Sequence, residues 1–112
     1  MSNLQLPIMS YENLSNLKVG KTGKIGYATH IDQDDKAVTV FHHGHPIALI
    51  TPSCIELNNR GYHTSTTTNR LKRVTLDNGA GRDVRIRDGV MQFVNNDGEI
   101  QDMHGSVIAW RG

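Results

Sequence analysis

The sequence predicts one α+β domain that is mostly β: a small antiparallel sheet, or a partly open barrel, of five or more strands with one short helix near residues 66–77. Three observations support this fold class. The chain has 112 residues, enough for about one hydrophobic core. Short β-branched runs recur between polar turns along most of its length. Only one stretch, after three consecutive threonines, carries apolar residues at a clear helical spacing over several turns.

Residues 1–112 are predicted to form a single domain, in which residues 1–23 are a loosely structured N-terminal segment. Residues 10–17 allow one helical turn with Leu14 and Leu17 facing inward. Two closely spaced glycines then favour a loop.

The predicted strands are short runs with β-branched or alternating apolar residues. Their approximate ranges are 25–31, 37–41, 47–51, 53–57, 84–87, 90–94, 99–103 and 107–110. Asp97-Gly98 lies between two of these runs and is the strongest hairpin signal in the chain.

The predicted helix begins after a threonine-rich passage. With Thr66 as N-cap, Thr67, Leu71 and Val74 fall on one face at positions i, i+4 and i+7. Asn78-Gly79 is typical of a helix end with glycine in the left-handed conformation. The remaining faces carry Asn69, Arg70, Lys72 and Arg73.

Charge is distributed unevenly, although the formal net charge is only +1. Residues 60–87 carry seven basic side chains against Asp77 and Asp83, a net of +5, between a segment 1–59 of net −1 and a segment 88–112 of net −3. This basic segment is either a footprint for an anionic partner or a solvated face that the acidic ends balance. Its predicted partner-binding residues are Tyr62, Thr66, Arg70, Lys72, Arg73, Arg85 and Arg87.

Several functional classes are disfavoured by composition. A single cysteine, Cys54, excludes an intramolecular disulfide, and no apolar run approaches the roughly 20 residues of a membrane helix. The N-terminal residues lack a basic flank followed by an apolar stretch. We therefore expect a cytoplasmic protein that does not bind membranes, and no sequence pattern indicates a cofactor.

A histidine cluster, His42, His43 and His45, is the first candidate for chemistry, because imidazole is a common metal ligand. A zinc site needs a third and fourth ligand, and Cys54 and the other histidines are not spaced to supply them. We expect solvent-exposed turn histidines and no metal.

Two short elements, His63-Thr64-Ser65 and His104-Gly105-Ser106, resemble the paired motifs of two-histidine phosphoesterases. The resemblance implies that both histidines serve as acid and base on a phosphodiester while the hydroxyls hold its oxygens. That family has a longer, duplicated α/β fold, so this enzymatic hypothesis is an alternative.

A second resemblance spans Pro46–Leu49 and residues 61–71. This pair of segments resembles small uncharacterised phage-encoded proteins, in which an apolar Pro-Ile/Val-Ala strand precedes a Tyr-x-x-Thr-Thr motif that enters a short basic helix. Asn69 and Arg70 stand where those proteins often have a histidine. The resemblance implies a phage origin and action in the host cytoplasm, and transfers no catalytic residue.

The leading hypothesis is a non-catalytic phage-type accessory protein that binds and modulates a host protein or complex, such as a defence or nucleic-acid-processing system. The first alternative is a nucleic-acid-binding module that uses residues 60–87. The second is the small phosphoesterase that acts on nucleotides.

Overall fold

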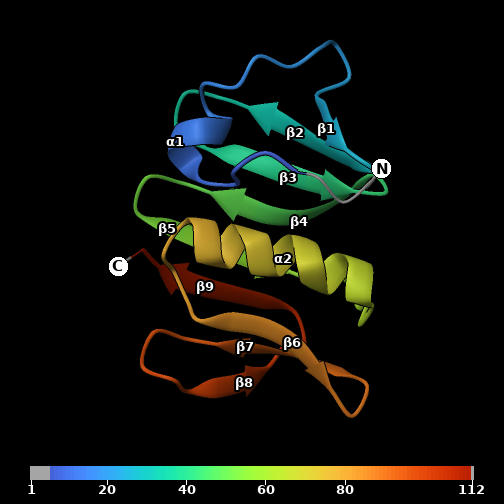
Figure 1. Ribbon diagram of the computed structural model, residues 1–112, viewed down its shortest axis with the longest axis vertical. Coiled ribbons are helices and arrows are strands. Elements are labelled where there is room, and N and C mark those ends of the chain that lie inside the picture. Colours follow the sequence, from blue (N-terminus) through green and yellow to red (C-terminus); the bar gives the residue numbers. More distant parts are fainter. Residues whose placement is uncertain (1–5, 112) are drawn as a thin grey trace.

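Two antiparallel sheets and one long helix make up the fold in the computed structural model, which describes residues 6–111 (Figure 1). The elements are α1 (Tyr11–Leu14), β1 (Lys24–Gly26), β2 (Thr29–Gln33), β3 (Val38–His42), β4 (His45–Ile50), β5 (Cys54–Asn58), α2 (Ser65–Asp77), β6 (Asp83–Arg87), β7 (Val90–Val94), β8 (Ile100–Asp102) and β9 (Ser106–Trp110). The mostly β fold class is therefore confirmed, and the sheets do not close into a barrel.

The larger sheet has the strand order β1-β2-β3-β4-β5-β9. Its first five strands follow one another through short connections, and β9 returns from the end of the chain to pair with β5, with Leu57 opposite Val107. The smaller sheet has the order β6-β7-β8, and its second hairpin turns at the predicted Asp97-Gly98 pair. Gly98 has a φ of +85°, the conformation that this turn requires.

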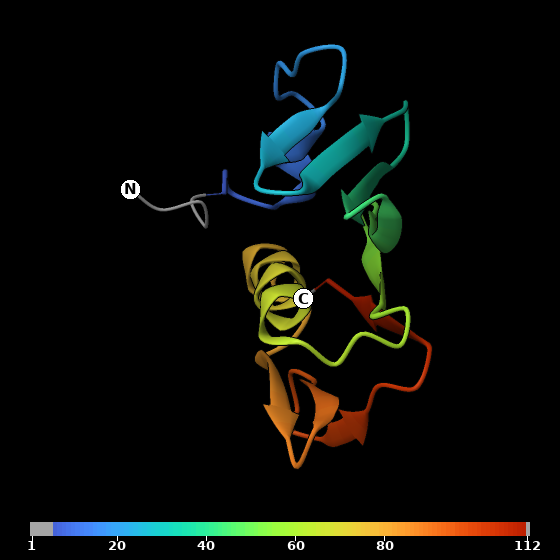
Figure 2. The ribbon, with the colours of Figure 1, turned by 90° about the vertical axis from the view of Figure 1, so that its right-hand side faces the viewer.

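Helix α2 contacts β4 and β5 of the larger sheet and β6 of the smaller one, so it joins the two sheets (Figure 2). Gly81 shows how closely the helix and the smaller sheet approach. A Cβ at Gly81 would lie 2.7 Å from Thr75 Cγ2 and 2.8 Å from Phe93 Cζ. Neither helix in the described part of the chain is long and apolar enough to cross a membrane.

The core lies between α2 and the inner faces of the sheets and is mainly aliphatic, as the low aromatic content requires. Phe93 is its one buried aromatic side chain among the described residues. The largest fully buried apolar side chains are Met9, Leu14, Ile47, Ile50, Ile55, Leu57, Leu71, Met91, Met103, Val38 and Val40.

Part of the N-terminal segment, which was predicted to be loosely structured over residues 1–23, packs against the core and the end of α2. Met9 and Leu14 are completely buried in the core. The Met9 N–H donates to Asp77 Oδ2 at 2.8 Å, and the Asn78 amide bridges Met9 O and the Tyr11 N–H. These anchors on the end of α2 could not be read from local sequence. Residues 1–5 of the predicted segment lie outside the described residues.

Helix α2 begins two residues earlier than predicted. Thr64, not Thr66, is the N-cap, and its Oγ1 accepts from the Thr67 N–H at 3.3 Å. A run of hydroxyl residues offers several equivalent caps, so the sequence alone could not place this boundary. The helix ends at Asn78 and Gly79, as predicted, with Gly79 at a φ of +63°.

Candidate functional site

Arg70, one of the predicted partner-binding residues, is buried in the fold. Its side chain is 1% exposed and lies between α2 and β2. Nε donates to Thr29 Oγ1 at 3.1 Å, and Nη2 donates to Tyr27 O at 3.1 Å. Burial lowers the pKa of the Arg70 guanidinium from its ordinary value. Arg70 is therefore not on the surface that the sequence analysis assigned to it.

Lys72 and Arg73 are partly exposed, but each has an acidic partner. Lys72 Nζ lies 3.2 Å from Asp83 Oδ1, which links α2 to β6. Arg73 Nε lies 3.4 Å from Asp77 Oδ2, and Arg73 Nη2 donates to Pro7 O. The helix thus presents a basic surface that is partly neutralised.

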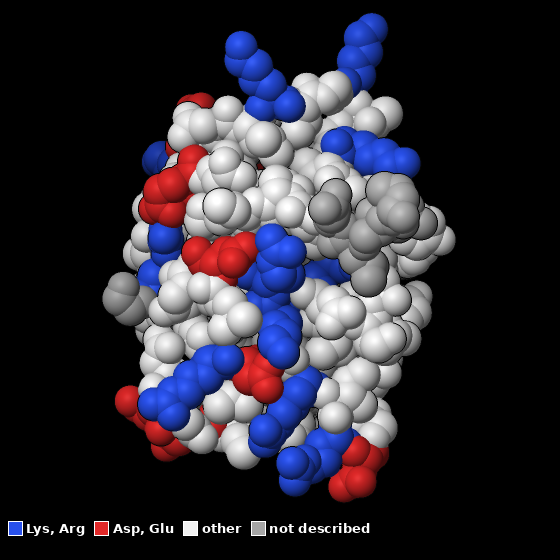
Figure 3. Space-filling view, viewed as in Figure 1, with Lys and Arg blue, Asp and Glu red and all other residues white. Residues whose placement is uncertain are grey.

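Arg85 and Arg87 lie beside this surface on β6. Arg85 Nε donates to Gln92 Oε1 at 3.4 Å, and Arg87 is exposed. Figure 3 shows basic side chains running down the face that carries α2, interrupted by acidic ones. Lys72, Arg73, Arg85 and Arg87 are thus partly or fully exposed, whereas Arg70 is buried.

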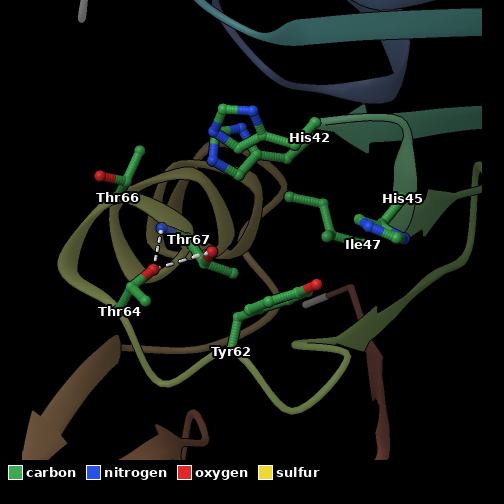
Figure 4. Close-up of a pocket in the computed structure, with 8 residues that line it drawn as sticks. His42, His45, Ile47, Tyr62, Thr64, Thr66 and Thr67 are labelled. Atoms are coloured by element: carbon green, nitrogen blue, oxygen red, sulfur yellow. Dashed lines mark hydrogen bonds between the residues drawn. The ribbon is translucent and has the colours of Figure 1, made fainter.

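Tyr62 and Thr66 lie in a different place, a pocket of about 330 Å³ at the N-terminal end of α2 (Figure 4). The predicted seven-residue site is therefore divided. The pocket is lined by three histidines of the β3–β4 turn and by residues of β4, the loop before α2 and its first turn: His42, His43, His45, Ile47, Tyr62, Thr64, Thr66 and Thr67. We call it the histidine–threonine pocket.

The β3–β4 turn places the three histidines around this pocket. His43 and Gly44 both have positive φ, +51° and +80°, between the paired residues His42 and His45. Two consecutive positive φ values are typical of a type I′ hairpin, whose twist matches that of the strands. The His42 and His43 ring centres lie 4.4 Å apart, and His45 lies 5.6 Å from the Tyr62 ring.

His42 differs from its two neighbours because it is 5% exposed, whereas His43 and His45 are exposed. Its buried Nδ1 has no hydrogen-bond partner among the described residues. Burial lowers the pKa of His42 to about 4, and the nearby His43 and Arg70 lower it further in the same direction. The His42 imidazole is therefore neutral at neutral pH. The prediction that all three turn histidines are exposed is wrong for His42.

Helix α2 supplies the opposite wall of the pocket. Thr64 Oγ1 caps the Thr67 N–H and also donates to Thr67 Oγ1 at 3.0 Å. The N–H groups of Ser65 and Thr66 have no intrahelical acceptor, because they belong to the first turn. Within residues 6–111, no three His, Cys, Asp or Glu side chains are arranged to hold a metal ion.

His63 and His104, the two histidines of the phosphoesterase hypothesis, lie together outside this pocket. Their ring centres are 6.4 Å apart. His63 Nδ1 accepts from the Met91 N–H at 2.8 Å, and His104 Nε2 lies 3.9 Å from Asp102 Oδ2. The fold therefore brings both histidines close to each other, while one ring nitrogen of His63 is used by the backbone of β7.

An apolar surface on β9 was not identified in the sequence analysis. Ile108 and Trp110 are 62% and 69% exposed, while the alternating residues Val107 and Ala109 are buried. Ile108 pairs with Glu56 of β5, and a groove beside β9 joins Ile108 and Trp110 to Asp97. The alternation of this strand is visible in the sequence, but both of its faces are apolar. Which face points outward could not be predicted.

Comparison with known proteins gives one informative match. The family model described as Kyanoviridae Gp96 protein matches residues 7–109, a range that includes α2 and nearly all of both sheets. Neither the comparison with curated proteins nor that with solved structures gives a significant match.

Proposed function

Because the chain belongs to the Kyanoviridae Gp96 family, a family of phage proteins, we propose that it is a non-catalytic accessory protein that binds and modulates a protein or complex of the host cell. The phage origin expected from the sequence agrees with this family. The observation that carries the proposal is the exposed pair Ile108 and Trp110 on β9. We call these two side chains the β9 apolar surface.

Trp110 is the most exposed of the large apolar side chains in the described residues. Trp110 is the chain's one tryptophan and is 69% exposed. Tryptophan is enriched among the few residues that contribute most of the binding energy at protein interfaces. Ile108 lies two positions before Trp110 in β9, so both side chains point to the same face of the sheet. A partner that contacts both would bury a larger apolar area. The β9 apolar surface therefore has the composition of an interface centre.

Acidic side chains flank this surface and indicate the chemistry of the partner. Glu56 lies opposite Ile108 in the register of β5 and β9, and Asp97 lines the groove that Ile108 and Trp110 share. A partner segment with an apolar anchor between basic residues complements this arrangement. This differs from the anionic partner expected for the basic segment 60–87.

The proposal is tested by capturing partners from host lysate, with and without nuclease treatment, and titrating the purified partner by calorimetry. We expect Trp110→Ala to weaken binding about 30-fold, the equivalent of about 2 kcal/mol for an interface anchor. Leu76→Ala is the matched control, because Leu76 is 44% exposed on α2 and also apolar. It should change affinity less than about 3-fold.

Three outcomes would contradict the proposal. The first is equal binding by the Trp110→Ala and Leu76→Ala variants. The second is capture that nuclease abolishes, which would favour the nucleic-acid-binding alternative instead. The third is a dimer in light scattering that Trp110→Ala dissociates, since a second copy of the chain would then cover the β9 apolar surface.

A two-histidine phosphoesterase is the second candidate function. The observation that favours it is the 6.4 Å separation of the His63 and His104 rings, which lie 41 positions apart in the sequence. Ser65 and Ser106, the hydroxyl residues of the two motifs, are both exposed. The Ser106 hydroxyl accepts from Asn58 Nδ2 at 3.3 Å.

A further inference from the structure

Strand β9 forms one edge of the larger sheet, because β5 is its one paired neighbour among the described strands (Figure 1). An edge strand presents a row of backbone N–H and C=O groups that have no partner within the sheet. Such a row can pair with an extended segment of another chain. The β9 apolar surface therefore lies on a strand that has one free side.

The register of β9 on β5 identifies the free backbone groups. The Arg111 N–H donates to Ser53 O at 2.9 Å, directly beyond the last paired residues of the two strands. Backbone directions alternate along an antiparallel strand, so the N–H and C=O groups of Ala109 also point toward β5. Those of Ile108 and Trp110 point toward the free edge. Within residues 6–111, no backbone hydrogen bond outside the sheet ladders uses Ile108 or Trp110.

The other edge strands carry features that oppose pairing with another chain. Strand β1 has three residues, begins with Lys24 and has an irregular register. Strand β6 contains Arg85 and Arg87, and β8 is a three-residue strand that ends at Asp102. Short length, charged side chains and bulges protect sheet edges in natural proteins. In contrast, β9 has five residues, none of them charged and none a proline.

A groove of about 240 Å³ lies between β9 and the turn that joins β7 to β8. Its lining includes the buried side chains of Phe93 and Ala109 and the exposed amides of Asn96 and Gln101. A segment that pairs with β9 would enter this groove. The amide side chains could then form hydrogen bonds with the second edge of the added strand.

Carboxylates at the turn indicate the charge of the segment. Asp97 lines the groove and is exposed, as is Glu99 in the same turn. Neither forms one of the ion pairs found within residues 6–111. The Arg82 side chain approaches the turn at Gly98, so two carboxylates face one guanidinium there. A segment that carries lysine or arginine would complement this charge.

We propose that the partner binds β9 by strand addition, with an extended segment that contains lysine or arginine among alternating apolar residues. This inference rests on the proposed function and specifies how its partner binds. The backbone of the segment would pair with the free N–H and C=O groups of Ile108 and Trp110. Its apolar side chains would lie beside these two residues on the exposed face of the sheet.

Random 10-residue peptides, displayed as a library and selected on the purified protein, provide the probe. We expect the selected peptides to carry lysine or arginine together with apolar residues at alternating positions. Amide hydrogen exchange measured by NMR then tests the pairing. In the free protein, the Ile108 and Trp110 amides should exchange much faster than the Ala109 amide. A saturating peptide should slow the exchange of the first two by at least about 10-fold.

Two variants of Ile108 separate the backbone from the side chain. Ile108→Pro removes an N–H that points away from β5, and proline is tolerated in edge strands at such positions. Ile108→Ala is the matched control, because it shortens the side chain and keeps the N–H. We expect Ile108→Pro to weaken peptide binding at least about 5-fold more than Ile108→Ala, the equivalent of one hydrogen bond. If Ile108→Pro does not fold by circular dichroism, the exchange measurement on the wild type decides.

Three results would overturn strand addition. The first is a selection that yields no peptide, and the second is peptide binding that leaves the exchange of the Ile108 and Trp110 amides unchanged. The third is protection of these amides in the free protein together with a dimer in light scattering, because a second copy would then occupy the edge. The proposed function has its own test. Host-partner binding that Trp110→Ala weakens, but that Ile108→Pro and Ile108→Ala affect equally, would retain the apolar anchor and exclude strand pairing.

Discussion

Reversing the charge of Arg70 should lower the free energy of unfolding far more than reversing the charge of an exposed arginine. In Arg70→Glu, a carboxylate replaces a guanidinium that is 1% exposed and donates to Tyr27 O and Thr29 Oγ1. An ionised glutamate only accepts hydrogen bonds, so it cannot donate to Tyr27 O. Its negative charge would also be repelled by the partial negative charge of this carbonyl oxygen. Arg87→Glu is the matched control, since Arg87 is exposed at the end of β6.

The magnitude follows from the ways in which a buried carboxyl can respond. Leaving a buried charge unpaired costs about 3–5 kcal/mol. A buried glutamate can avoid this cost by binding a proton. Protonating a carboxyl whose ordinary pKa is about 4.3 costs about 1.36 kcal/mol for each pH unit above that value, so the cost at pH 7 is at most about 3.7 kcal/mol. We therefore expect Arg70→Glu to lower the free energy of unfolding by about 3–4 kcal/mol. A domain of this size has a total of about 5–15 kcal/mol. Arg87→Glu should change it by less than about 0.5 kcal/mol.

Urea unfolding followed by circular dichroism measures both variants. At pH 5 the limit set by protonation falls to about 1 kcal/mol, so the difference between Arg70→Glu and Arg87→Glu should shrink. Arg70→Met keeps most of the side-chain volume and removes the charge. It should cost little, because Tyr27 O still accepts from Thr29 Oγ1 at 2.7 Å. Equal stability of Arg70→Glu and Arg87→Glu at pH 7 would refute the burial of Arg70.

Two further predictions concern histidines. The pKa of His42 is lowered to about 4 in the folded protein, so the unfolded chain binds more protons between pH 6.5 and 4 and folding stability is lost as the pH falls through this window. At about 1.36 kcal/mol per pKa unit, the loss amounts to at most about 3 kcal/mol. The free energy of unfolding, measured across this pH window, should decline less steeply for His42→Phe than for the wild type. If the protein is non-catalytic, His63→Ala and His104→Ala should leave its partner binding unchanged, and the wild type should not hydrolyse cyclic or linear oligonucleotides. Hydrolysis that either single variant abolishes would establish the phosphoesterase function instead.

The hairpins and the helix were predictable because local sequence determines them. Asp97-Gly98 favours a tight turn through glycine at positive φ, and Asn78-Gly79 ends α2 for the same reason. The division into two sheets was not predictable, since β5 pairs with β9 across more than forty intervening residues. No local pattern specifies such a pairing, and it decides that β6, β7 and β8 form a sheet of their own.

Arg70 could have been recognised as a core residue from its spacing. Thr67, Arg70, Leu71 and Val74 stand at i, i+3, i+4 and i+7, the full apolar stripe of a helix that packs on a sheet, and the structure buries all four. The charge of the Arg70 side chain predicts a polar face instead, and that prediction is wrong. The acceptors that make its burial possible, Tyr27 O and Thr29 Oγ1, lie more than forty positions away. Spacing was therefore a better guide than residue type at this position.

The burial of Arg70 also changes which surface a partner can use. Of the basic residues in segment 60–87, Arg70 is inside the fold, and Lys72 and Arg73 are paired with Asp83 and Asp77. Part of the segment's net charge of +5 therefore holds α2 against β2, β6 and the N-terminal segment. Exposed, partly neutralised pairs contribute little to binding or stability. We therefore expect a partner to gain more from the exposed apolar anchor on β9 than from these paired charges.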